Sequence, residues 1–192
     1  MTLRSLTLSG CLAAAMVAAP VLSLAATKPT APERDRRGAR TEALELLKQL
    51  QGKAYLAAEH ASELQSTTHS PNASWQIHAL RLEALKEDVN TMGRQLSQLE
   101  TIRDSATPWE RKAIDEAAPL LRLMADNIQA AMKLVSDTPG TLWVPAYQKH
   151  VDNLAGECDR LHSSVGQVVK FAKVHANEQH LERTLGISAA SL

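Results

Sequence analysis

The stretch from Trp75 to Leu99 constrains the fold of this chain most strongly. Its apolar residues recur at alternating steps of three and four, and only one histidine interrupts them. Charged and polar residues fill the positions in between. This spacing predicts a helix with one apolar seam, which must pack against other helices to be shielded from water. The seam residues are Trp75, His78, Leu82, Leu85, Val89, Met92, Leu96 and Leu99.

Three other stretches have apolar seams with the same three-and-four spacing. The chain therefore has four candidate helices, each of which must pack against the others to bury its seam. Their residues are Ala43, Leu47, Leu50, Ala54, Ala57, Ala61 and Leu64 in the first, Ile114, Ala117, Leu121, Met124, Ile128, Ala131 and Val135 in the second, and Val144, Tyr147, Val151, Leu154, Cys158, Leu161, Val165, Val168, Ala172 and His175 in the third.

Short turns separate the four seams. Thr107-Pro108-Trp109-Glu110 has the pattern of a capping box, with threonine at the N-cap and glutamate three residues later. The low aromatic content, 3% against 44% hydrophobic residues, favours helices over a sheet. Four long helices with short connections predict an all-α, antiparallel up-down-up-down four-helix bundle. We expect its helices over about 41–67, 72–105, 108–136 and 141–183.

Residues 1–26 have the pattern of a cleavable signal peptide. Arg4 precedes an apolar run, and Ser23-Leu24-Ala25 offers small residues at a cleavage site. Two alternatives are a transmembrane anchor and lipidation at Cys11. The many alanines weaken the anchor, and cleavage before Cys11 would leave a very short apolar region ahead of the cut. We therefore expect a periplasmic or secreted protein without stable membrane insertion after signal removal. The segments are the signal peptide (1–26), a linker or loosely ordered helix lead-in (27–40), the bundle (41–184) and a flexible tail (185–192).

The net charge and the cysteine content argue against several classes of function. The formal net charge is zero, which argues against a nucleic-acid-binding protein, since such domains are usually strongly basic. Loss of the signal peptide would leave one cysteine, Cys158, and therefore no intrachain disulfide. Because Cys158 falls on a helix seam, we expect a buried and unreactive thiol rather than a nucleophile.

Three histidines are candidate metal ligands. Counting the rise per residue in the predicted bundle places His60, His78 and His150 at a similar depth below one end. Converging imidazoles could hold Zn²⁺ or Cu²⁺ or supply an axial ligand to haem. The alternative is structural: His78 lies on a seam and finds a polar partner, while His60 and His150, each one residue before a seam position, face water. No compact ligand motif favours the metal site.

We expect packing roles for the glycines within the predicted helices and for the tryptophans at the helix ends. We expect Gly93, Gly156 and Gly166 to mark close contacts between helices. We expect the three tryptophans to close the ends of the core with their rings buried. They are Trp75, Trp109 and Trp143.

No sequence pattern for catalysis is present. The chain lacks Glu-x-x-His, Cys-x-x-Cys-His, His-Glu-x-x-His and Gly-x-Ser-x-Gly, and it has no phosphate-binding loop. The leading hypothesis is an exported, non-catalytic helical bundle, a monomer or small homo-oligomer, that acts by protein interaction or scaffolding in the cell envelope. The alternative is a metal- or haem-binding bundle that uses the three histidines.

Overall fold

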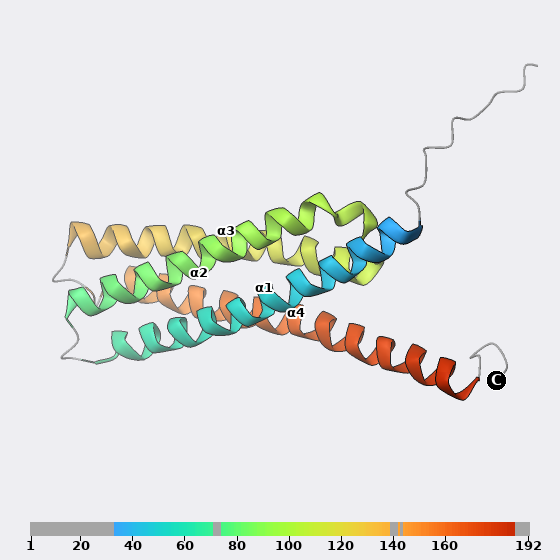
Figure 1. Cartoon of the computed structure of the whole chain (residues 1–192). Helices are drawn as coiled ribbons and strands as arrows, with labels where there is room; N and C mark the ends of the chain where they lie inside the picture. Colours follow the sequence, from blue (N-terminus) through green and yellow to red (C-terminus); the bar gives the residue numbers. More distant parts are fainter. Residues whose placement is uncertain (1–32, 71–73, 139–141, 143, 187–192) are drawn as a thin grey trace, which may run out of the picture. The chain divides into compact units, whose positions relative to one another are not determined.

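The computed structural model describes residues 33–70, 74–138, 142 and 144–186. Within these ranges the protein is all-helical, and four helices pack against one another (Figure 1). The predicted all-α, four-helix fold is therefore confirmed, while the predicted signal peptide, Cys11 and Trp143 lie outside the described residues. The elements are α1 (Glu33–Thr68), α2 (Trp75–Thr101), the short 3₁₀ helix η1 (Arg103–Ser105), α3 (Pro108–Asp137) and α4 (Pro145–Leu185).

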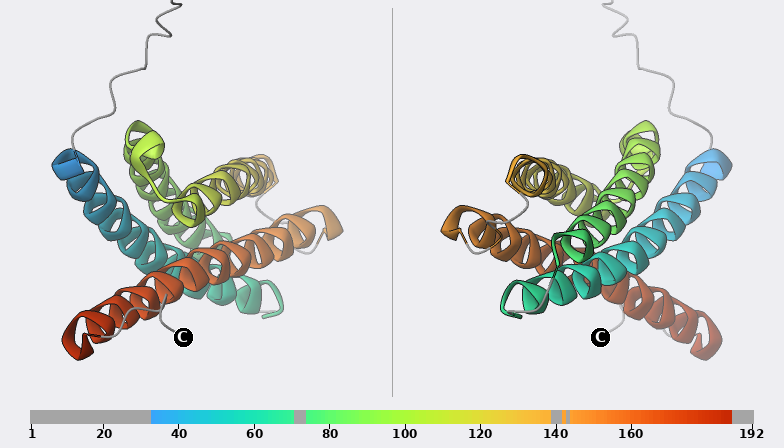
Figure 2. Two further views of the ribbon diagram at one scale, coloured as in Figure 1. Left: turned by 90° about the vertical axis from the view of Figure 1, so that its right-hand side faces the viewer. Right: turned by 90° about the vertical axis from the view of Figure 1, so that its left-hand side faces the viewer.

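The helices enclose one core. α1 packs on α2 and α4, and α3 packs on the same two helices, whereas α1 and α3 share few contacts. The helices therefore surround a common centre, with α1 and α3 diagonally opposed, as the end-on views show (Figure 2). Every predicted seam residue of α1 and α3 is buried. On α2 and α4 most are buried too, but Trp75 and His175 are exposed, and three others are only partly buried: Leu96, Val144 and Val168.

Local sequence signals account for the helix ends. The capping box is confirmed: the Thr107 hydroxyl accepts from the Glu110 N–H, and the Glu110 carboxylate accepts from the Thr107 N–H at 2.7 Å. α4 begins at Pro145 rather than near 141, because proline suits the first helical position, where no backbone donor is needed. α4 ends before Gly186, whose φ of 66° is the left-handed conformation that terminates helices.

Other boundaries differ from those expected. α1 begins at Glu33, within the stretch expected to be a linker or helix lead-in. α2 ends at Thr101, and the 3₁₀ turn η1 replaces the last predicted helical turn. Helix α3 continues through Pro119, whose ring lies on the exposed side where the missing backbone donor disturbs no packing.

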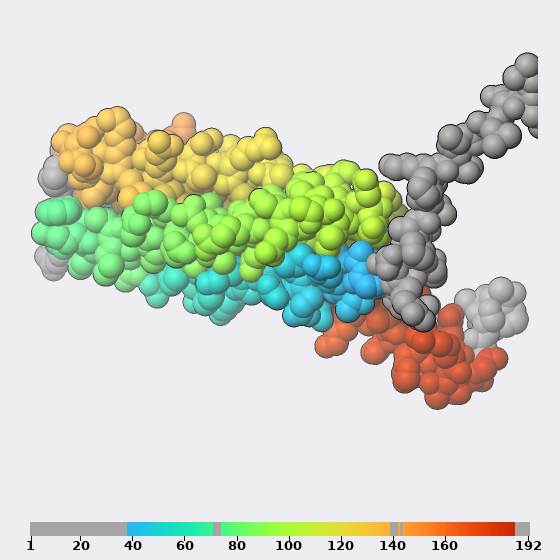
Figure 3. Space-filling view, turned by 45° about the horizontal axis from the view of Figure 1, so that its top comes forward, coloured from blue at the N-terminus to red at the C-terminus, as the bar shows by residue number. Residues whose placement is uncertain are grey.

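The C-terminal part of α4 projects beyond the other helices (Figures 1 and 3). α4 has 41 residues, about 60 Å of helix, against 27 residues in α2. Within the described part of α4 that follows Ala172, almost every residue is exposed. The last turns of α4 therefore have no partner within the bundle. Among the described helices, none is both long and apolar enough to cross a membrane.

Candidate functional site

His60 on α1 pairs with a buried carboxylate on α2. The His60 Nδ1 lies 2.7 Å from Oδ2 of Asp88, and the Lys53 ammonium lies 3.5 Å from Oδ1 of the same side chain. Asp88 is only 5% exposed, so two basic groups of α1 compensate the cost of its burial. His60 also borders a cavity of about 300 Å³ between α1 and α2, together with the apolar side chains of Ile77 and Leu80.

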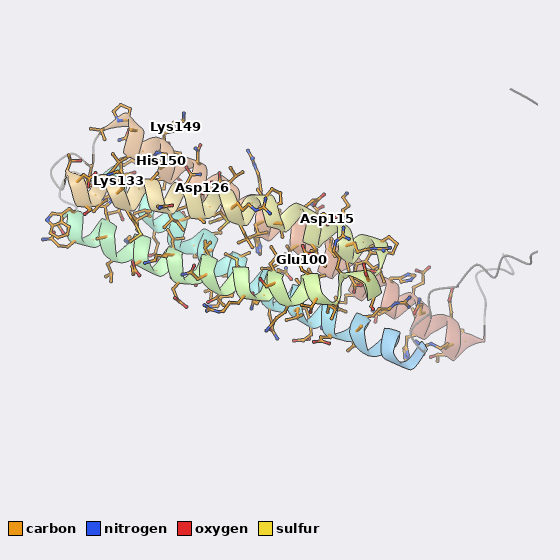
Figure 4. The ribbon with its side chains drawn as sticks, turned by 90° about the horizontal axis from the view of Figure 1, so that it is seen from above. Glu100, Asp115, Asp126, Lys133, Lys149 and His150 are labelled. Carbon is orange, nitrogen blue, oxygen red and sulfur yellow. The ribbon has the colours of Figure 1, made fainter. Side chains whose placement is uncertain are left out.

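His150 belongs to a second polar group, between α3 and α4. Its Nδ1 lies 2.8 Å from Oδ1 of Asn127, and the Asn127 amide donates to both carboxylate oxygens of Glu157 at 3.0 Å. Burial raises the pKa of Glu157, and the hydrogen bond from Asn127 opposes that shift. Figure 4 places His150 on α4 near α3, at the end of the bundle where α4 begins.

His78 lies in the core and bonds to a buried tyrosine. Its Nδ1 is 2.8 Å from the Tyr147 hydroxyl, and the two rings meet edge-on with centroids 5.5 Å apart. Both side chains are almost completely buried. Burial lowers the pKa of His78, and the charge of Arg81 lowers it further. The tyrosine partner therefore bonds a neutral imidazole at neutral pH.

This pKa shift predicts a pH dependence of stability. A histidine with a depressed pKa stays neutral in the folded protein while the unfolded chain binds a proton near its ordinary pKa of about 6.5. The contribution of His78 is therefore complete above that pH and is lost as the pH falls towards the lowered pKa of the folded state. We expect the His78→Gln variant, which retains a partner for Tyr147, to lose less stability than the wild type between about pH 7.5 and about pH 5.5 in urea titrations. Equal losses in both proteins would contradict the assignment.

The three histidines thus have three different partners. Their Nδ1 atoms bond to Asp88, Tyr147 and Asn127 on different helices. Within the described residues, no group of three or more His, Cys, Asp or Glu side chains has the geometry to hold a metal ion. Metal or haem binding by His60, His78 and His150 stays a prediction, and the structural role expected for His78 matches its contact with Tyr147.

Sequence reasoning missed the partners of two of these histidines. Asp88, Asn127 and Glu157 are buried, yet none was singled out. Each lies one residue before a seam position, as do His60 and His150. Side chains at that edge of a seam face the neighbouring helix, where polar groups can meet. Charged or amide residues at this offset are candidates for such groups, although Glu116 and Asn153 at the same offset are exposed.

Cys158 is buried as expected. Its side chain is fully inaccessible, and burial together with the nearby carboxylates of Glu157, Asp159 and Asp88 raises its pKa to about 12. At neutral pH the thiol therefore remains protonated, and water-soluble reagents cannot reach it.

Two packing expectations need correction. Trp75 does not close the core, because it is 43% exposed, and Trp109 packs edge-on against Phe171 of α4. Close helix contact is confirmed only for Gly166, where an added Cβ would lie 3.0 Å from the Gln51 amide nitrogen. At Gly93 and Gly156 a Cβ would meet no atom within 4 Å. A glycine within a helix lowers stability by about 0.5–1 kcal/mol relative to alanine. No contact of the described residues explains this cost at Gly93 or Gly156.

An apolar surface follows the projecting end of α4. Phe171, Val174, Leu181 and Leu185 are each more than half exposed. At 100° per residue they fall within an arc of roughly 80° on one face of the helix, which also carries the exposed Glu178 between Val174 and Leu181. We call these four residues the α4 stripe. Phe171 contacts the Trp109 ring at 5.8 Å and stacks on His175 at 6.0 Å, which holds the first side chain of the stripe in place.

Comparisons with protein-family models, curated proteins and solved structures returned no match to this chain.

Proposed function

We propose that this chain is an exported, non-catalytic helical bundle that binds another protein through the α4 stripe. In this proposal, residues 1–26 are removed as a signal peptide, and the mature protein is periplasmic or secreted. The four helices alternate in direction as an up-down-up-down bundle. The bundle then acts as a rigid support that holds the projecting end of α4 away from its core.

The observation that carries the proposal is the exposure of the α4 stripe. Four large apolar side chains are exposed on one face at the end of α4, with Glu178 among them, and clustered exposed apolar side chains mark interaction sites. Aromatic residues are enriched at such sites, and the Phe171 ring already packs edge-on against Trp109 within this chain. The opposite face of the same helix is polar or small, as Ala176 and Arg183 show.

Site-specific photo-crosslinking tests the proposal. A benzophenone amino acid at Leu181 is expected to give a discrete crosslinked product in the cells that export the protein, because this position lies on the stripe. The matched control carries the same group at Ala176, on the opposite face of α4, and is expected to give none. Both positions are exposed, so neither substitution disturbs the core. A product of twice the mass would identify a second copy as the partner. No product from Leu181, or equal products from both positions, would contradict the proposal.

A further inference from the structure

A carboxylate lies within the apolar surface at the end of α4. Glu178 falls between Val174 and Leu181 on the face that carries the α4 stripe, at the middle of its length. The Glu178 side chain is 64% exposed, so water solvates its charge. A partner that covers the α4 stripe must also cover Glu178 and displace that water. Burial of a charged group is costly unless an opposite charge is buried with it.

One basic side chain lies close to this carboxylate. The Nδ1 atom of His175 is 3.7 Å from Oε2 of Glu178, one turn along the helix. The Gln179 amide donates to the Nε2 atom of His175 at 3.0 Å, so the proton of the neutral ring is on Nδ1, on the side of Glu178. The His175 ring also stacks on Phe171, with 6.0 Å between the centroids and 8° between the planes. The imidazole therefore lies between the first side chain of the α4 stripe and the carboxylate.

The neighbouring elements bring no other base to this carboxylate. On α4, a second carboxylate, Glu182, follows one turn beyond Glu178. α3 contributes Trp109, which contacts Phe171 and has no charge. α1 also packs on α4, but the two helices diverge towards this end of α4 (Figures 1 and 2). Among the side chains that the structure describes, His175 is the only base within ion-pair distance of Glu178.

We propose that binding of a partner to the α4 stripe is coupled to protonation of His175 and is therefore stronger at acidic pH. This inference rests on the proposed function, because it concerns the regulation of the same surface. When His175 is protonated, it forms an ion pair with Glu178, and the partner covers a pair without net charge. When His175 is neutral, the partner must cover a carboxylate that no cation compensates. Histidine is the side chain that most often changes charge between about pH 5 and about pH 8.

Linkage between the proton and the partner determines the direction of the effect. The bound form holds the proton on His175 more tightly than the free form, because the covered Glu178 carboxylate has no other cation beside it. The affinity for the partner therefore increases as the pH falls from about 7.5 to about 5.5. Uptake of a single proton changes an affinity by at most about tenfold per pH unit.

Photo-crosslinking at two pH values tests the inference. Cells that export the protein with the benzophenone amino acid at Leu181 are irradiated at about pH 5.5 and at about pH 7.5, and the yields of the crosslinked product are compared. We expect the yield at the lower pH to be at least about threefold higher. The same group at Ala176, on the opposite face of α4, measures the background at each pH.

Three substitutions in the same background assign the effect to the pair of His175 and Glu178. Glu178→Gln removes the charge and keeps the size of the side chain, so a high yield is expected at both pH values. His175→Gln cannot take up the proton, so a low yield is expected at both. Glu182→Gln is the matched control, because it makes the same chemical change one turn farther along, and it is expected to keep the pH dependence of the wild type. None of the three side chains is buried.

Equal yields at the two pH values would overturn this inference and leave the proposed function intact, since a product still forms. An unchanged pH dependence in His175→Gln would overturn it as well, because the partner would then supply its own cation to Glu178. Loss of the pH dependence in Glu182→Gln would also overturn it, by showing that the total charge of the helix end controls binding. The absence of any product from Leu181 at both pH values would contradict the proposed function itself, and this inference with it.

Discussion

Leu154→Ala is expected to lower the free energy of unfolding by about 2–5 kcal/mol. Leu154 lies in the first third of α4 and is completely inaccessible to solvent. Its truncation removes buried methyl groups and leaves a cavity that the surrounding helices fill only in part, because protein interiors are closely packed. Urea unfolding followed by circular dichroism measures the change as a shift of the midpoint without a change in slope.

The matched control for this prediction is Leu80→Ala. Leu80 belongs to α2 and is 73% exposed, so the same chemical change removes little buried surface. We expect its free energy of unfolding to stay within about 0.5 kcal/mol of the wild type. A loss at Leu80 equal to that at Leu154 would show that the four seams do not form the core described above.

The thiol of Cys158 is expected to react with Ellman's reagent at least about a thousandfold more slowly in the folded protein than in guanidinium chloride. At pH 8, raising the pKa from about 8.5 in the unfolded chain to about 12 lowers the thiolate fraction by about three orders of magnitude. Burial slows the reaction further, because the reagent must wait for the helices to open. The measurement uses the Cys11→Ser variant, so that only one thiol is present.

An exposed cysteine provides the control for reactivity. Ser163→Cys, combined with Cys158→Ala and Cys11→Ser, places a single thiol on the exposed side of α4, five residues from the buried position. It is expected to react at nearly the rate of the unfolded chain. Rapid reaction of Cys158 in the folded protein, at the rate of this control, would contradict its burial in the core.

The features that the sequence predicted correctly depend on local order along the chain. The seam residues of α1 and α3 are buried as expected because the period of a helix determines which residues share a face. The capping box at Thr107 and Glu110 formed because its two hydrogen bonds join residues only three positions apart. Burial of Cys158 follows from its place on the seam.

The features that the sequence did not predict depend on how the helices are placed against one another. His60 and His150 were assigned similar heights from residue counts, but the structure pairs them with Asp88 and Asn127 on different sides of the bundle. Height along a helix can be counted from a sequence. The rotation and tilt of each helix, which determine the partner of a side chain at the edge of a seam, arise only when the helices pack.

By itself the sequence determined the four helical seams, the all-α class and the sites of several helix ends, because helical periodicity and capping act between residues a few positions apart. Only the tertiary structure decided which surfaces remain uncovered. The α4 stripe is exposed because the end of α4 projects beyond the other helices, and open hollows lie between α2 and α3 because those two helices pack less closely than the other neighbouring pairs. The sequence predicted that the last helix is the longest, but how far its end projects past the neighbouring helices, and how closely the helices pack, are decided only when the bundle assembles.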